Sequence, residues 1–87
     1  MIFGCPVCAY DGLDEDPRTV AGGGSFEICP SCGFQFGVSD DDEGFTYDAW
    51  RKQWIDGGME WDKGRSPPPS GWNPVRQLAR LGVSVRR

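Results

Sequence analysis

The sequence predicts an α+β fold, in which a small β-hairpin unit is followed by a tryptophan-rich helix and a short C-terminal helix. Three observations support this prediction. All four cysteines fall in two Cys-Pro-x-Cys pairs near the start of the chain. Polar and apolar residues alternate on both sides of the second pair, as they do in a strand. Later in the chain, the apolar residues recur at helical spacing.

The length of 87 residues predicts one domain, residues 1–87. Within it, we expect residues 1–40 to form the cysteine-containing unit and residues 41–87 to form a helical part that packs on it. A chain this short buries little apolar surface, so a covalent or metal cross-link is expected to add stability. Four Trp, five Phe and two Tyr are large enough to build a compact core.

Residues 25–38 predict the β-hairpin. Residues 25–28 and residues 34–38 alternate between polar and apolar side chains, and a tight cysteine-containing turn lies between them. Residues 11–24, which precede this segment, are polar and contain three consecutive glycines, which is typical of a loop.

Two helices are predicted in the second half of the chain. The first begins after Thr46, a favourable N-cap, and ends at Gly57. Phe45 and Trp50 stand at the positions of a hydrophobic staple across its start. The second has Asn73 as its cap, ends at Gly82, and follows a stiff proline-rich connector. Its predicted inward side chains are Val75, Leu78 and Leu81.

The two cysteine pairs predict a metal site. Two residues between cysteines allow one turn to present both sulfurs to a single ion, and two such turns complete a tetrahedron. Because the chain has no histidine and no other cysteine, this site uses every soft ligand and leaves no position for water. We therefore expect a structural site rather than a catalytic one. The predicted metal ligands are Cys5, Cys8, Cys29 and Cys32.

Four sulfur ligands in a tetrahedron accept either zinc or iron. We expect zinc, with iron as the alternative. The stretches CPVCAY and CPSCG are similar to the two metal-binding turns of rubredoxins. The hairpin unit is therefore predicted to be a zinc ribbon of rubredoxin-like form.

Almost the whole chain resembles a group of small, uncharacterised bacterial cysteine-rich proteins of the Cys-Pro-Cys-Cys type. The resemblance implies a zinc-ribbon or rubredoxin-like fold, and it implies no particular reaction. The matching segments are CPVCAYDGLDE, SFEICPSCGFQFGVSDD, FTYDAWRKQWIDGGMEW and WNPVRQLARL.

Charge divides the chain into an acidic part and a basic part. Residues 1–50 carry ten acids and one base, whereas residues 51–87 carry eight bases and three acids. We expect the basic part to fold back on the acidic part, with an external anionic partner as the alternative. The residues predicted to meet a partner are Asp40, Asp41, Asp42, Arg76, Arg80, Arg86 and Arg87.

Together these features predict a zinc-binding, non-enzymatic binding or adaptor module that contacts another protein. A rubredoxin-like iron electron carrier is the alternative. A nucleic-acid-binding accessory factor is a further one, because the four arginines could meet phosphates. No apolar run approaches the length of about 20 residues that a membrane helix needs. The N-terminus lacks the pattern of a secretory signal, so we expect a cytoplasmic protein with reduced thiols.

Overall fold

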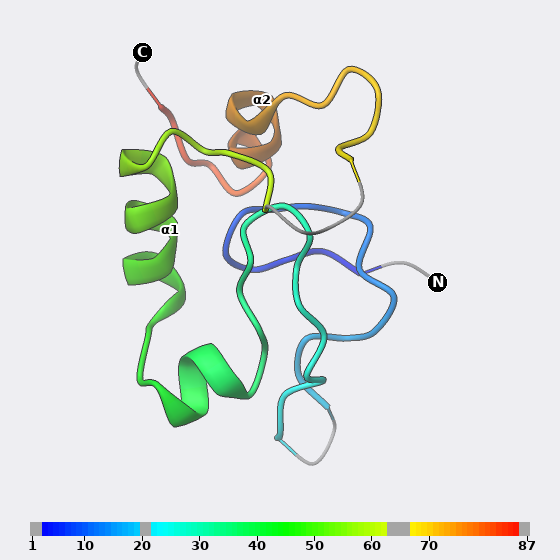
Figure 1. Ribbon diagram of the computed structural model, residues 1–87, viewed down its shortest axis with the longest axis vertical. Coiled ribbons are helices and arrows are strands. Elements are labelled where there is room, and N and C mark those ends of the chain that lie inside the picture. Colours follow the sequence, from blue (N-terminus) through cyan, green and yellow to red (C-terminus); the bar gives the residue numbers. More distant parts are fainter. Residues whose placement is uncertain (1–2, 20–21, 63–66, 86–87) are drawn as a thin grey trace.

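The computed structural model describes residues 3–19, 22–62 and 67–85. In these residues the helices are the π-helix η1 (Val38–Asp42) and the α-helices α1 (Tyr47–Asp56) and α2 (Pro74–Ala79). Two loops precede η1, and each contains one cysteine pair. Figure 1 shows α1 running along one side of these loops, with α2 above them.

The predicted α+β fold, with its zinc-ribbon, rubredoxin-like β-hairpin, was wrong. The described part of the chain contains no β-strand. Its extended segments pair only through isolated antiparallel bridges, which are Phe3–Leu13, Arg18–Gly24 and Ile28–Gln35. The architecture is instead a set of irregular loops around a core, flanked by three short helices.

The hairpin expected over residues 25–38 does not form because its pairing is interrupted. Phe36 N donates to Glu27 O at 3.3 Å, whereas Phe36 O accepts from Phe26 N at 2.9 Å. Phe26 and Glu27 therefore lie opposite the single residue Phe36, as in a β-bulge. Phe26 also has a φ of 66°, which lies outside the range of strands. The segment then turns into η1 instead of continuing as a strand.

The core lies around the cysteine-bearing loops. Phe34 and Phe36 are fully buried, with their ring centroids 5.1 Å apart. Tyr47 and Trp50 of α1 meet the ring of Phe34 edge-on at 5.4 and 5.3 Å. The alternating pattern thus marked two buried side chains, Phe34 and Phe36, but Phe26 in the same pattern is 63% exposed, and no strand forms.

Helix α1 begins and ends as predicted. The side chain of Thr46, the N-cap, accepts a hydrogen bond from Ala49 N at 3.0 Å. The rings of Phe45 and Trp50 pack edge-on at 5.1 Å, which is the expected hydrophobic staple. Gly57 is the C-cap. Because α1 contains no fully buried residue, it lies on the surface of the core rather than within it.

Helix α2 begins as predicted but faces the core with different residues. Asn73 is its N-cap, and its side chain accepts from Arg76 N at 3.0 Å. Leu78 is buried as expected, but Leu81 is 43% exposed because the helix has already ended at Ala79. Gln77 occupies the inward position instead, and it is only 2% exposed.

The connector between α1 and α2 is held by aromatic rings. The ring centroids of Trp61 and Trp72 lie 5.1 Å apart, in an edge-on arrangement. Tyr10, from the first loop, packs edge-on against Trp61 at 5.4 Å. Pro67, Pro68 and Pro69 of the predicted stiff connector are exposed, whereas Ser66 lies outside the described residues.

Candidate metal centre

The four cysteines converge on one point in the core. Their Sγ atoms all lie within 4.8 Å of one another, and all four are buried free thiols. Cys5 Sγ and Cys32 Sγ are 3.9 Å apart, and Cys8 Sγ and Cys29 Sγ are 3.7 Å apart. For zinc–sulfur bonds of about 2.3 Å, a regular tetrahedron has sulfur–sulfur edges of about 3.8 Å. The spacing therefore fits a single tetrahedral ion.

Both cysteine pairs adopt the same turn. Cys5 O accepts from Ala9 N at 2.8 Å, and Cys29 O accepts from Gly33 N at 2.8 Å. The residue that follows each pair has a left-handed backbone, with a φ of 71° at Ala9 and 81° at Gly33. One local geometry, used twice, thus brings the two sulfurs of each pair to the common point.

Helix α1 contacts both turns. Trp50 Nε1 donates to Cys32 O at 3.0 Å, in the second turn. The guanidinium of Arg51 donates to Pro6 O at 2.8 Å and also to Val7 O, in the first turn. Two neighbouring residues of one helix therefore hold the backbones of the two turns in a fixed relation.

Gln77 of α2 joins the two turns at a second point. Its Nε2 donates to Cys8 O at 3.0 Å and to Ser31 Oγ at 3.1 Å. Its Oε1 accepts from Trp72 Nε1 at 2.9 Å. Since Ser31 is fully buried and Gln77 nearly so, these hydrogen bonds satisfy polar groups that water does not reach.

The sequence did not identify Arg51 or Gln77 as part of the site. The contacts of Arg51 span 44 and 45 residues, and the contact of Gln77 with Cys8 spans 69. The one available signal was a polar residue directly beside the apolar positions of α2. No comparable signal marks Arg51.

Crowding of the sulfurs controls how they ionise. Hydrogen bonds with the thiols of Cys29, Cys5 and Cys8, together with burial, raise the pKa of Cys32 well above its ordinary value. Burial also opposes ionisation of Cys8, but hydrogen bonds with Cys29, Cys32 and Cys5 outweigh it and lower the pKa of Cys8. The crowding of the four sulfurs therefore acts in opposite directions on the pKa values of Cys8 and Cys32. A bound cation would favour the thiolate form of all four sulfurs.

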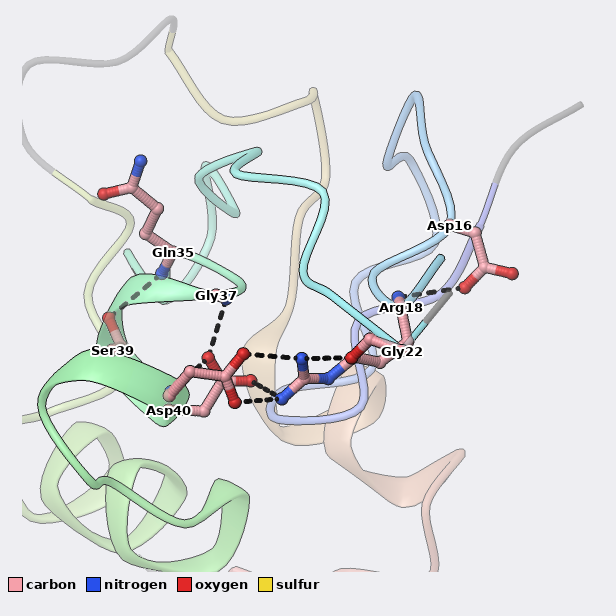
Figure 2. A network of polar contacts seen from close by, with 8 residues as sticks. Asp16, Arg18, Gly22, Gln35, Gly37, Ser39 and Asp40 are labelled. Atoms are coloured by element: carbon pink, nitrogen blue, oxygen red, sulfur yellow. Dashed lines mark hydrogen bonds and ion pairs between the residues drawn. The ribbon is translucent and has the colours of Figure 1, made fainter. Parts of the chain in front are cut away.

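The predicted acidic partner residues are mostly engaged within the chain. The Arg18 guanidinium donates to Asp40 Oδ2 at 2.7 Å and to both carboxylate oxygens of Asp41, at 2.7 and 2.9 Å. Asp40 Oδ1 also accepts from Gly37 N at 2.7 Å, as Figure 2 shows. Asp42 is exposed. Arg18 thus links the second half of the first loop to η1.

Of the predicted basic partner residues that the structure describes, Arg76 and Arg80 are both exposed and line the same pocket as Asp11. Arg80 Nη1 donates to Asp11 Oδ2 at 2.6 Å, which ties α2 to the first loop. Arg76 is exposed, and no ion pair of its guanidinium occurs within the described ranges. Arg86 and Arg87 lie outside the described residues.

Together the loops and the sulfur cluster define a cysteine-rich protein with a candidate metal site. The chain is 35% identical over 71 residues to "Uncharacterized protein YoaQ" and 34% identical over 74 residues to "Uncharacterized protein YozI", both from Bacillus subtilis. These alignments cover 66% and 68% of this chain, which spans only 60% and 61% of the two curated relatives. No family model and no solved structure matches the chain.

The comparisons support the predicted resemblance in part. The homologues are uncharacterised Bacillus proteins, as the resemblance implied, but no family model confirms the zinc-ribbon type. Among the described residues, no helix is both long enough and apolar enough to cross a membrane.

Proposed function

We propose that the sulfurs of the four cysteines bind one zinc ion, and that the chain serves as a non-enzymatic binding module for another protein. The observation behind this proposal is the convergence of four buried Sγ atoms within 4.8 Å of one another, with two separations, 3.9 and 3.7 Å, close to the edges of a tetrahedral zinc site. Four protein sulfurs complete the coordination of zinc, which is typical of structural sites.

The proposed ion explains why irregular loops have a defined shape. The described residues before η1 have no strands to order them, and the core contains all four cysteines. Structural zinc contributes on the order of 10 kcal/mol to folding in small peptides. A contribution of that size is comparable to the whole stability of a small domain.

A binding role is supported by the surface that such a site would hold in place. Asp42 and Glu43 are exposed directly after the Arg18-linked turn, and Arg76 is exposed on α2. Charged groups on an ordered backbone lose less freedom when a partner binds than groups on a disordered one. We infer that the partner is a protein with complementary charges.

Elemental analysis of protein purified without added metal tests which metal the four cysteines bind. We expect one zinc per chain, a colourless protein, and loss of the zinc in Cys29→Ser but not in the surface control Ser70→Ala. A red protein with one iron and reversible one-electron reduction would replace this proposal with the electron carrier. A protein that binds neither metal would overturn it.

Partner capture tests the binding role. Zinc-loaded protein would be cross-linked in extract of its native cells, and the captured protein would then be tested with Asp42→Lys and Arg76→Glu. We expect at least one of these changes to weaken binding, while the control Lys52→Glu does not. If the chain instead captures nucleic acid, with an affinity that falls with salt and with Arg76→Ala, the accessory-factor alternative holds.

A further inference from the structure

The four cysteine residues are not covered equally. Cys32 keeps 7% of its surface exposed, whereas the exposure of Cys5, Cys8 and Cys29 is 1% or less. Cys32 also lines two cavities, of about 390 and 190 Å³, and the other three cysteines line neither of them. Of the four cysteines, Cys32 is therefore the residue that lies next to open space.

The larger of these spaces, which we call the Cys32 cavity, lies between α1 and the segment that follows it. Trp54 forms part of its wall and is fixed by a hydrogen bond from its Nε1 to Glu60 O at 2.9 Å. Asp62 N donates to Pro30 O at 3.1 Å, which ties the opposite wall to the second turn. The main lining residues are Cys32, Gln53, Trp54, Glu60, Trp61 and Asp62.

The described residues that line the Cys32 cavity favour a cation. Among them are two carboxylates, Glu60 and Asp62, and no lysine or arginine. The Asp62 carboxylate lies close to the second turn, because a Cβ atom placed on Gly33 would be 3.1 Å from Asp62 Oδ1. A cleft lined by one sign of charge raises the local concentration of the opposite ion.

The other three cysteines lack a comparable approach. Cys5 is 1% exposed, Cys8 and Cys29 are fully buried, and none of them lines either cavity. Trp50 Nε1 covers the backbone carbonyl of Cys32, but the Cys32 residue still lines both cavities. The side of Cys32 is therefore the most open approach to the site.

We propose that the Cys32 cavity is the route by which a divalent metal ion enters and leaves the four-sulfur site, and that Cys32 is the first ligand to dissociate. This inference rests on the proposed metal-binding function. In the exchange, a water molecule from the cavity would replace the Cys32 sulfur as a ligand of the ion. The released Cys32 thiolate would take a proton from water, and no electron would be transferred.

The order in which the cysteines of the zinc-loaded protein are alkylated tests which ligand dissociates first. Iodoacetamide would be added in small excess, and peptide mass mapping would locate the first thioether as zinc release is followed. We expect the first label on Cys32, with zinc lost in step. A first label on Cys5, Cys8 or Cys29, or equal labelling of all four, overturns the proposal. If added zinc does not slow labelling at all, the metal-binding function itself fails, which is a separate result.

The charge of the route is tested by comparing anionic iodoacetate with neutral iodoacetamide. Glu60→Gln should raise the rate of iodoacetate at Cys32, relative to iodoacetamide, by about two-fold or more, because it removes one negative charge from the cavity. The same variant should slow displacement of zinc by added cadmium. The matched control is Glu43→Gln, an exposed carboxylate that does not line the cavity. If Glu60→Gln and Glu43→Gln had the same rates of iodoacetate labelling at Cys32 and of zinc displacement by cadmium, the proposed route would be overturned.

Discussion

At the scale of single residues, the two turns of the candidate metal site differ in the residue that follows the second cysteine. Ala9 and Gly33 occupy the same place in each turn, and both have a left-handed backbone. Glycine adopts this conformation freely, whereas a residue with a Cβ atom loses about 1–2 kcal/mol there. The first turn therefore contains a strained residue that the second turn avoids.

Replacing Ala9 with glycine should relieve this strain. We expect Ala9→Gly to raise the free energy of unfolding of the metal-loaded protein by about 0.5–1 kcal/mol, as measured by denaturant titration. Gly33→Ala should lower it by about 1–2 kcal/mol, because its Cβ atom would also approach Asp62. The control Ala49→Gly, in α1, should lower it by up to about 1 kcal/mol. A loss in Ala9→Gly as large as in this control would contradict the interpretation.

Arg18 also acts at this scale, through its bond to an acidic turn. Its hydrogen bonds lower the pKa of Asp41. A carboxyl whose pKa is lowered in the folded state stabilises that state above its unfolded pKa, and the contribution is lost as the pH falls through the folded value. The link between the first loop and η1 should therefore weaken in acid, at a pH below about 4.

Arg18→Ala should return the pKa of Asp41 toward its ordinary value, because the donors that favour the carboxylate are gone. Carbon-detected NMR titration of the Asp41 carboxyl measures this directly. Arg18→Lys is the matched variant, since it keeps the charge but cannot form the two parallel hydrogen bonds. An unchanged pKa in Arg18→Ala would show that these hydrogen bonds do not persist in solution.

At the scale of elements, α1 and α2 hold the turns mainly through polar contacts. Neither helix is long, and α1 has no fully buried residue. Instead, Trp50, Arg51 and Gln77 donate hydrogen bonds to backbone carbonyls of the two turns. Each helix therefore stabilises the site by donating hydrogen bonds to loop carbonyls that have no strand partner.

Gln77→Leu should be strongly destabilising. It keeps roughly the same volume but leaves Cys8 O and the hydroxyl of Ser31 without this buried donor, and each such loss costs about 1–3 kcal/mol. We expect a total loss of about 2–4 kcal/mol in the free energy of unfolding, together with faster zinc release to a chelator. The control Ser84→Leu, at an exposed position after α2, should change stability by less than about 0.5 kcal/mol. Similar losses in the free energy of unfolding for the two variants would show that Gln77 does not stabilise the site.

Some of these elements were predictable because their signals are local. The caps at Thr46 and Asn73 depend only on residues three positions away, so both helix starts were predicted correctly. The hairpin was predicted wrongly. The alternation of polar and apolar residues marked the buried Phe34 and Phe36, but it does not report the exposure or the left-handed backbone of Phe26, nor the start of η1.

The site was predictable only in part, for the same reason. Two residues between cysteines bring a pair together locally, and the clustering of the two pairs followed from the few ligands that the chain offers. Arg51 and Gln77 reach the turns from more than 40 residues away, and no local pattern marks them. Leu81 was predicted to face inward but is exposed, and the reason is the same, because its exposure depends on where α2 ends.

At the scale of the whole molecule, the buried core is organised around the sulfurs. The buried cluster contains all four cysteines beside Val7, Leu13, Phe34 and Phe36, and the aromatic rings of α1 pack against it. The proposed ion would therefore be a central part of the core. Its removal should affect the structure of the whole described chain rather than one loop.

Chelation should consequently unfold the protein. We expect a strong chelator to abolish the native tryptophan fluorescence and the cooperative thermal transition, and added zinc to restore both. Zinc affinity should fall as the pH is lowered, because protons compete for the sulfurs and the pKa of Cys32 is raised in the absence of an ion. Competition with a chromogenic chelator at several pH values measures this trend. A stable fold in excess chelator would contradict the central role of the ion.

The long reach of Gln77 has a consequence for how the protein is made. Chains emerge from the ribosome N-terminus first. All four thiols are therefore complete once residue 32 has been added, while the amide that covers Cys8 O belongs to residue 77 and is added later. A chain that has not yet reached residue 77 would hold its ion without this shield. The ion should thus be most easily taken by competing cellular chelators during translation, and become kinetically trapped only when α2 docks.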